Sequence, residues 1–458
     1  MRIEDLSAQL QGRVIEPEDP DYDDARQVFY GAIDRKPAHI VRVAGAADVT
    51  RTVMFARESR LELAVRSGGH SVLGHSVSEG GVVLDLRDMR GLMIDDRNRT
   101  AWAETGLTAR EYTEATHAHG VATGFGDTGS VGIGGLTLGG GVGFLSRKQG
   151  LTIDNLIAAE MVTADGQVVR ADAETNPDLY WAIRGGGGNF GVATLFGYRL
   201  LEVGTVYGGM LLLPARADVI ADFIAAAEAA PDELTTIANV MPAPAMPFLP
   251  AEAVGKLSIM ALMVCTGPLN AAERTVAPFR KLVQPLADML RPMPYPEIYM
   301  PEDPNYHPVA ASRTMFADTF DLRSAHTVVE HLEASTAKFQ AAQIRVLGGA
   351  ISNVPQDATA YAHRTRRLMI NVAALYDHAE EATEHEAWAE SFWKALRNGP
   401  PGAYVNFLSG DGQARLRDAY PVGALDRLAA VKARYDPDNL FRLNQNITPA
   451  RSAAGQGL

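Results

Sequence analysis

The sequence predicts an α+β protein in which a glycine-rich first part precedes an antiparallel sheet backed by helices. Its 458 residues are enough for two or three domains. Glycine clusters and short apolar segments with alternating polarity fill the chain up to about residue 200. From residue 201 to about 400 glycine becomes rarer, and apolar runs alternate with helical stretches. Strands and helices that share a layered core in this way are typical of an α+β arrangement.

In the first part, the periodicity of apolar residues and the positions of capping and turn residues predict individual elements. Thr108 and Glu111 have the spacing of a capping box, and Gly120 is suited to the far end, so we expect a helix over 109–119. Asp165-Gly166 separates two apolar segments and predicts a hairpin turn. We expect a helical turn at 177–183 and further helices and strands at the following positions: helix 47–58, and strands 39–43, 61–66, 81–86, 100–104 and 192–200.

The second part gives fewer signals. Helices are expected at 217–229, 270–282 and 379–397, and strands within 208–213, 256–264 and 368–374. Proline-rich segments near 242–250 and 292–308 indicate loops. A last helix is expected over 423–434, where Asp436-Pro437 stops it.

Composition argues against several classes of function. The chain has 42 basic and 55 acidic residues, a net charge of −13, and no basic run longer than two residues, so we expect no binding to nucleic acid or to a membrane surface. The most apolar run, 257–265, is far shorter than the ~20 residues that span a bilayer. The N-terminus has no signal-peptide pattern, and Cys265 is the single cysteine. A cytoplasmic protein is expected, and the histidine spacings predict no metal site.

The segment 61–76 carries the first chemical signal. An alternating strand ends in Arg66-Ser67-Gly68-Gly69-His70-Ser71. Adjacent glycines let the backbone turn tightly and approach a ligand, and exposed N–H groups together with a guanidinium suit a phosphate-bearing molecule. Taken alone, this short pattern is equally compatible with an ordinary tight turn.

Two further glycine clusters change that balance. Residues 124–150 contain eleven glycines in 27 positions, and 184–191 read RGGGGNFG. So much glycine costs backbone entropy, which is reasonable where backbone must lie against a flat or phosphorylated ligand. The second cluster contains G-x-G-x-x-G, but a helix is expected before it and a strand after it. That order is the reverse of a Rossmann dinucleotide site, which we therefore reject.

These motifs together resemble the flavin-binding domain of the vanillyl-alcohol oxidase superfamily, in its berberine-bridge-enzyme-like branch. The likeness extends to 150–155 (GLTIDN) and to 435–447 (YDPDNLFRLNQNI). It implies a two-part PCMH-type FAD-binding domain and a substrate domain. The expected boundaries are 1–34 for an N-terminal segment, 35–200 for the FAD domain, 201–400 for the substrate domain, and 401–458 for a C-terminal segment that packs back on the FAD domain.

The resemblance also implies how FAD is held. The histidine of R-S-G-G-H in this family bonds to the 8α carbon of the flavin, so His70 is the expected attachment point. Some relatives add a cysteinyl link at the position of Thr128, whose hydroxyl cannot form it, so a single link is expected. The remaining residues expected to contact the cofactor are Arg66, Ser67, Gly68, Gly69, Ser71, Gly129, Val131, Gly134, Gly135, Gly139, Gly140, Gly141, Val192, Asn444 and Asn446.

For catalysis the resemblance points to Tyr404 and Asn406. Tyr404 matches the first tyrosine of a Y-x-N-Y motif, but Phe407 stands where many relatives have the second. Tyr404 is therefore either the base that accepts the substrate proton or only a wall of the pocket, and Asn406 would orient it. Val131 falls where relatives place a residue that gates oxygen access to the flavin.

The expected reaction is hydride transfer from an alcohol, hemiacetal or related C–H of a small to mid-sized substrate to covalent FAD, with O₂ as acceptor and hydrogen peroxide as product. Two alternatives remain open: a dehydrogenase that uses another acceptor, and a flavin-bearing binding or cyclase protein without net redox turnover. The sequence leaves the oligomeric state open.

Overall fold

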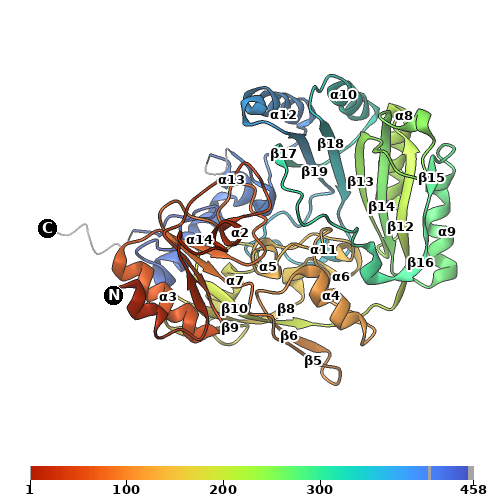
Figure 1. Cartoon of the computed structure of the whole chain (residues 1–458). Coiled ribbons are helices and arrows are strands. Elements are labelled where there is room, and N and C mark those ends of the chain that lie inside the picture. Colours follow the sequence, from red (N-terminus) through yellow and green to blue (C-terminus); the bar gives the residue numbers. More distant parts are fainter. Residues whose placement is uncertain (1, 411–413, 452–458) are drawn as a thin grey trace.

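The computed structural model describes residues 2–410 and 414–451. Two smaller sheets of four and five strands and one large sheet of eight strands organise it, and a further pair of short strands forms a two-stranded sheet (Figure 1). The first small sheet has the order β1-β2-β4-β3, in which β2, β4 and β3 run parallel and β1 is antiparallel to β2. Val49 and Val53 of the covering helix α3 pack on this sheet. The elements of this region are α1 (Ile3–Ser7), β1 (Arg13–Ile15), α2 (Tyr22–Arg26), β2 (His39–Arg42), α3 (Ala46–Ser59), β3 (Leu63–Arg66) and β4 (Val82–Asp85).

The second small sheet is antiparallel throughout, with the order β5-β6-β10-β8-β9. Its neighbouring helix α4 begins with the expected capping box: Thr108 Oγ1 accepts from Glu111 N at 3.2 Å, and the Glu111 carboxylate accepts from Thr108 N at 2.9 Å. The elements are β5 (Leu92–Asp95), β6 (Thr100–Glu104), α4 (Ala109–His117), β7 (Val121–Ala122), α5 (Ile133–Gly139), α6 (Ser146–Gln149), β8 (Leu156–Val162), β9 (Val168–Asp172), α7 (Pro177–Ala182), β10 (Val192–Arg199) and β11 (Leu201–Glu202).

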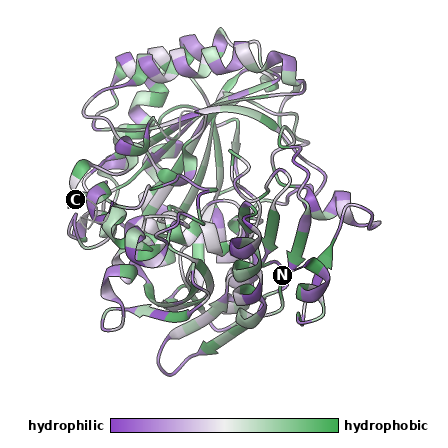
Figure 2. Cartoon of the chain, turned by 90° about the vertical axis from the view of Figure 1, so that its left-hand side faces the viewer, coloured by the Kyte–Doolittle hydropathy of each residue, from purple (hydrophilic) through white to green (hydrophobic). Residues whose placement is uncertain are grey.

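The large sheet has the order β15-β12-β14-β13-β18-β19-β17, and β16 also pairs with β12. Its helices carry both hydrophilic and hydrophobic residues along their length (Figure 2). The elements are β12 (Thr205–Pro214), α8 (Ala217–Ala229), β13 (Leu234–Pro242), β14 (Leu257–Cys265), α9 (Leu269–Arg280), β15 (Ala287–Asp288), β16 (Arg291–Pro294), β17 (Val309–Ala317), α10 (Leu322–Glu333), β18 (Phe339–Val346), α11 (Ala350–Asn353), β19 (Leu368–Tyr376) and α12 (Ala382–Leu396).

The two faces of the large sheet differ in their surroundings. Ala238, Ile344 and Ile370 belong to a core that also contains Phe223 of α8 and Phe392 of α12. Because side chains alternate along a strand, the residues between them point the other way. That opposite face is directed toward the glycine-rich first part of the chain, and it includes Gln343 and Asn371.

The C-terminal segment returns to the first part of the chain. Helices α13 (Leu416–Ala419) and α14 (Val422–Tyr435) follow the large sheet, and α14 packs beside α7. Asn189 fixes the last stretch, because its Oδ1 accepts from Ile447 N at 2.9 Å and its Nδ2 donates to Gln445 O at 3.2 Å. The C-terminal stretch is therefore attached to the third glycine cluster.

The α+β class predicted from the sequence is confirmed. The expected helices over 109–119, 217–229 and 423–434 match α4, α8 and α14 within two residues at each end, and the Asp165-Gly166 hairpin joins β8 to β9. The order helix α7, glycine cluster, strand β10 agrees with the rejection of a Rossmann site. Strands β13, β17 and β18 and helix α10 were not predicted. None of the helices in the described residues combines the length and apolar character that a transmembrane span requires.

Candidate active site

A cavity of about 480 Å³ lies where the glycine clusters meet the large sheet. One wall comes from the glycine-rich first part and the other from strands of the large sheet, so we call them the glycine wall and the strand wall. The C-terminal segment contributes Asn444 between them. The predicted site residues that line the cavity are Ser67, Gly68, Gly69, His70, Ser71, Val131, Gly134, Gly135, Val192, Tyr404, Asn406 and Asn444.

His70 is held from two sides at the end of the glycine loop. Its ring stacks on Phe29 with centroids 4.3 Å apart and planes 21° apart, and its Nε2 lies 3.0 Å from Ser130 Oγ. Burial lowers the pKa of His70 to about 4, although the nearby Glu302 carboxylate opposes the shift. The imidazole is therefore neutral at physiological pH, with a lone pair available on one ring nitrogen.

Some glycines of this wall are required because two backbone segments touch. A Cβ on Gly68 would lie 2.2 Å from Gly132 N, and a Cβ on Gly132 would lie 2.2 Å from Gly68 N. Ser67 locks the same contact, since its Oγ donates to Thr105 O at 2.6 Å and accepts from Gly134 N at 3.2 Å. The first two glycine motifs thus form one structural unit.

Other glycines of this wall face open space. Gly135 and Gly188 line the cavity, and a Cβ on either would meet no atom within 4 Å. Packing inside the protein therefore does not explain why these positions lack a side chain. A flat ligand lying against the backbone does explain it, and an FAD molecule fits such a cradle.

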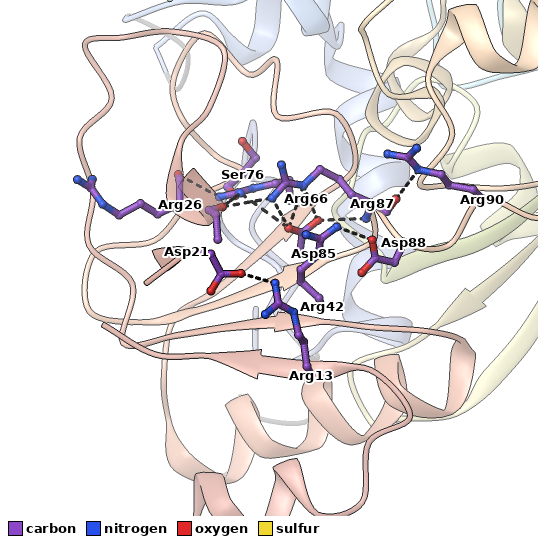
Figure 3. A network of polar contacts seen from close by, with 11 residues as sticks. Arg13, Asp21, Arg26, Arg42, Arg66, Ser76, Asp85, Arg87, Asp88 and Arg90 are labelled. Carbon is purple, nitrogen blue, oxygen red and sulfur yellow. Dashed lines mark hydrogen bonds and ion pairs between the residues drawn. The ribbon is translucent and has the colours of Figure 1, made fainter. Parts of the chain in front are cut away.

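The expectation that the Arg66 guanidinium holds a pyrophosphate is wrong. Its side chain is 1% exposed; it donates to Ser76 O at 3.1 Å and to the carbonyl of Ala25, and lies 3.9 Å from Asp85 (Figure 3). Alternation along β3 explains this placement, because Leu63 and Val65 face the cavity and Arg66 must face away. Arg66 instead anchors backbone carbonyls behind the loop.

Five other expected cofactor contacts lie outside the cavity lining. At four of them glycine is needed for packing: a Cβ on Gly139 or Gly140 would approach Asn406 or Tyr404, one on Gly141 would approach Thr152, and one on Gly129 would approach Arg110. Gly139 and Gly140 therefore make room for the catalytic candidates, whereas Gly141 and Gly129 make room for Thr152 and Arg110. Asn446 is the fifth of these residues.

Tyr404 projects from the start of a short 3₁₀ turn against the glycine-rich helix α5. Its Oη accepts from Gly141 N at 2.8 Å and from Asn406 Nδ2 at 3.0 Å. Burial raises the pKa of Tyr404, whereas these two donors and the Arg345 charge act to lower it. Both donors stabilise negative charge on the phenolic oxygen. Phe407 packs edge-on against the ring, with centroids 5.1 Å apart.

The strand wall was missed by sequence reasoning. Asn239, Gln343, Asn371 and Thr314 are direct cross-strand partners on β13, β18, β19 and β17, so they form one row on one face. Gln343 Nε2 donates to Asn239 Oδ1 at 2.9 Å, whereas Asn371 Oδ1 is buried without a hydrogen-bond partner among the described residues. A polar residue within an apolar strand was the available signal.

An ion pair stands beside this row. Arg345 Nη2 lies 2.5 Å from Asp127 Oδ2, and the Arg345 guanidinium lies 5.0 Å from the centre of the Phe407 ring. Asp127 belongs to the glycine-rich stretch and Arg345 to β18, so the pair joins the two walls. Because the charges compensate each other, the cavity at this point is polar without a large net charge. The described residues contain no group of three or more side chains suited to a metal ion.

Comparison with known proteins agrees with this architecture. The FAD binding domain family matches residues 37–172, and the berberine and berberine-like family matches residues 403–448. An uncharacterised FAD-linked oxidoreductase, YvdP of Bacillus subtilis, is 32% identical over 97% of this chain and 100% of its own length. The (R)-6-hydroxynicotine oxidase of Paenarthrobacter nicotinovorans is 30% identical over 97% and 98%.

Solved structures extend the comparison to the fold. The crystal structure of 6-hydroxy-D-nicotine oxidase from Arthrobacter nicotinovorans superposes with a TM-score of 0.86 at 27% identity, over 96% of this chain and 99% of that one. A berberine-bridge-enzyme-like protein of Physcomitrella patens reaches 0.88 at 22% identity, over 99% and 100%. The chain therefore belongs to the PCMH-type, berberine-bridge-enzyme-like family and is an FAD-dependent oxidoreductase.

Proposed function

We propose that the protein is an oxidase that carries FAD on His70 through a single covalent link. It would oxidise an alcohol, hemiacetal or related C–H of a small to mid-sized polar molecule and pass the electrons to O₂, which gives hydrogen peroxide. The observation that carries this proposal is the continuity of one cavity, which includes His70, the open glycines of its cradle, Tyr404, and Gln343 and Asn371 of the polar row.

The glycine wall supplies the cofactor contacts. Ser67, Gly68, Gly69 and Ser71 would hold the pyrophosphate through backbone N–H and hydroxyl groups, while Gly135 and Gly188 leave room for a flat ring. His70 is neutral and oriented by Phe29, as attachment requires. Thr128 also lines the cavity, and its hydroxyl offers no thioether, which is why we propose one link. When bound, FAD accepts a hydride from the substrate.

Tyr404 would remove the substrate proton. Two hydrogen-bond donors already point at its oxygen, so the phenolate that accepts a proton is stabilised in place. Asn406 fixes this arrangement because its Nδ2 also donates to Leu136 O at 3.1 Å. The tyrosine would act in its phenolate form, and the chain provides no second tyrosine at position 407 to share that role.

The strand wall favours a substrate with both donor and acceptor groups. Asn371 Oδ1 needs a donor, and Nη1 of the Arg345 guanidinium is buried without a hydrogen-bond partner among the described residues, so it needs an acceptor. Val131 on the opposite wall is small, which agrees with an oxygen path to the flavin. A hydroxyl-rich or hydroxyl- and carbonyl-bearing molecule matches these needs better than a hydrocarbon.

The test has two arms. After acid denaturation, the peptide that contains His70 should carry the mass of one FAD, and a His70→Ala variant should carry none. An oxygen electrode would then screen sugars, aromatic alcohols, secondary amines and polyketide-like alcohols. Flavin that bleaches anaerobically with a substrate and recovers in air indicates an oxidase. Recovery only with an added acceptor indicates a dehydrogenase, and bleaching with no candidate contradicts redox turnover.

A further inference from the structure

A chain of hydrogen bonds connects His70 to a carboxylate from the second part of the chain. His70 Nε2 lies 3.0 Å from Ser130 Oγ, and Ser130 Oγ contacts Glu302 Oε2 closely. The other carboxylate oxygen, Oε1, accepts from Ser130 N at 3.0 Å. Glu302 lies 172 positions from Ser130 in the sequence, so neither side chain stands beside His70 by local geometry.

The loop that carries Glu302 is fastened at both ends. Arg110 Nη2 donates to Tyr299 O at 3.1 Å and to Met300 O at 2.8 Å. The His307 ring is within 3.0 Å of Val28 O, next to the Phe29 that stacks on His70. The side chain of Glu302 is only 30% exposed. The carboxylate is therefore held in place at Ser130 rather than free to leave it.

The direction of these hydrogen bonds follows from the chemistry of each group. An ionised carboxylate only accepts, so Ser130 must donate its O–H to Glu302. Ser130 Oγ can then only accept from the imidazole, which places the His70 proton on Nε2. The lone pair of His70 is consequently on Nδ1. Glu302 thus selects, through Ser130, which ring nitrogen is the nucleophile.

We propose that Ser130 and Glu302 are positioning residues for the attachment of flavin to His70, a step that rests on the covalent link proposed above. In this step a bond forms between His70 Nδ1 and the 8α carbon, and one C–H bond of that carbon breaks. One proton leaves the imidazole and one leaves the carbon. The two electrons are taken up by the ring system and pass to O₂, which becomes hydrogen peroxide. Glu302 stabilises the positive charge that develops on the imidazole.

The experiment measures the rate at which FAD becomes covalently attached, and it does not depend on catalytic turnover. Apoprotein from flavin-depleted cells is mixed with FAD in air, and samples are denatured over time. Flavin fluorescence of the denatured band measures the covalent fraction, and total bound flavin is measured before denaturation. The variants are Ser130→Ala, Ser130→Thr and Glu302→Gln. Asp303→Asn is the matched control, because it removes a neighbouring charge whose contact is Asn305 N.

We expect all variants to take up FAD, with attachment about tenfold or more slower in Ser130→Ala and Glu302→Gln, the scale for a hydrogen bond to a charged group. Ser130→Thr keeps the hydroxyl and should restore the rate, and Asp303→Asn should match the wild type. Equal rates of flavin attachment in all proteins would contradict the positioning role proposed for Ser130 and Glu302. If Glu302→Gln fails to take up FAD, the comparison of Ser130→Ala with Ser130→Thr tests the proposal. Slower attachment in Ser130→Ala supports the positioning role, and equal rates of attachment in the two variants refute it.

A separate arm tests the link itself. His70→Ala should hold FAD only until denaturation. Covalent flavin in that variant, or none in the wild type, would refute attachment at His70. Both of these results concern His70 alone and do not depend on the Ser130 and Glu302 variants. Failure of the hydrogen-bond chain and failure of the covalent link can therefore be distinguished.

Discussion

The two walls of the cavity are built in different ways. The glycine wall consists mainly of backbone that carries no side chains. The backbones of Gly68 and Gly132 are in direct contact, and Gly135 borders open space. The strand wall works through a row of side chains, Asn239, Gln343 and Asn371, supported by strand pairing. A residue at such a direct backbone contact cannot gain a side chain without disturbing the chain path. A residue of the strand wall can change its side chain, because the backbone bonds of the sheet persist.

This difference predicts how each wall tolerates substitution. Changes at close backbone contacts of the glycine wall should affect folding and cofactor together. Changes in the strand wall should leave the flavin in place and alter substrate binding. In the function that we propose, the cofactor side of the cavity is thus the part that tolerates little change, and the substrate side is the part in which residues can change.

The largest effect is expected for Gly132→Ala. Its Cβ would lie 2.2 Å from Gly68 N and 2.2 Å from Ser67 Oγ, and the backbone atom cannot move without opening the loop. Overpacking of this kind costs about 1–3 kcal/mol or more in the free energy of unfolding. We expect loss of stability in urea unfolding and loss of flavin absorbance. Gly423→Ala is the control, since a Cβ there meets nothing within 4 Å. Full flavin content in Gly132→Ala would contradict the close contact.

The next effect is expected for Tyr404→Phe. Removal of the hydroxyl that we propose as general base should lower kcat by a factor of about 10²–10⁴, with flavin content unchanged. Gly141 N and Asn406 Nδ2 lose their acceptor, so stability should also fall slightly. Tyr361→Phe is the matched control: its ring lies 6.2 Å from that of Tyr404, and its buried hydroxyl has no hydrogen-bond partner among the described residues. A wild-type rate in Tyr404→Phe would make Tyr404 only a pocket wall.

Tyr404 also fixes the expected pH dependence. Burial raises the pKa of Tyr404, so at neutral pH the phenol is mostly protonated and the base is scarce. The reactive phenolate becomes more abundant as pH rises, and kcat should rise with it. Rates measured between pH 6 and pH 10 (roughly the range below the usual tyrosine pKa) should show this increase in the wild type. The increase should disappear in Tyr404→Phe, and its persistence there would assign it to another group.

The same contrast explains what the sequence could and could not predict. The glycine wall was visible because R-S-G-G-H and the two later clusters are local patterns. The strand wall was not, because Gln343 and Asn371 become neighbours only through the register of β18 and β19. Glu302 reaches Ser130 only through the tertiary fold.

For Arg66, a local pattern led to a wrong prediction. The motif predicted a guanidinium that binds phosphate, whereas alternation along β3 places the side chain on the opposite face of the strand. Local patterns therefore identified glycine-rich backbone that lines the cavity, whereas strand geometry decides the direction of each side chain.

A smaller effect is expected for Asn371→Leu on the strand wall. Leucine has a similar volume and removes a buried oxygen that has no hydrogen-bond partner within the described chain, so stability should not fall. A substrate donor would lose its acceptor, and KM should rise about tenfold. Thr236→Val removes a similarly unpartnered hydroxyl from β13, at a position whose alternation places it on the helix-covered face. Equal KM values in the two variants would remove Asn371 from the substrate site.

The smallest effect on folding is expected for Gly135→Ala, which separates the two uses of glycine in one wall. A Cβ there meets nothing within 4 Å, and the residue lies in helix α5, so the apoprotein should be unchanged or more stable by up to about 1 kcal/mol. The same methyl group would project into the cavity. If Gly135 lies against the cofactor, FAD should bind a few-fold more weakly to an apoprotein that unfolds normally. Unchanged FAD affinity would place the flavin elsewhere along the glycine wall, because a ligand in contact at this point cannot ignore an added side chain.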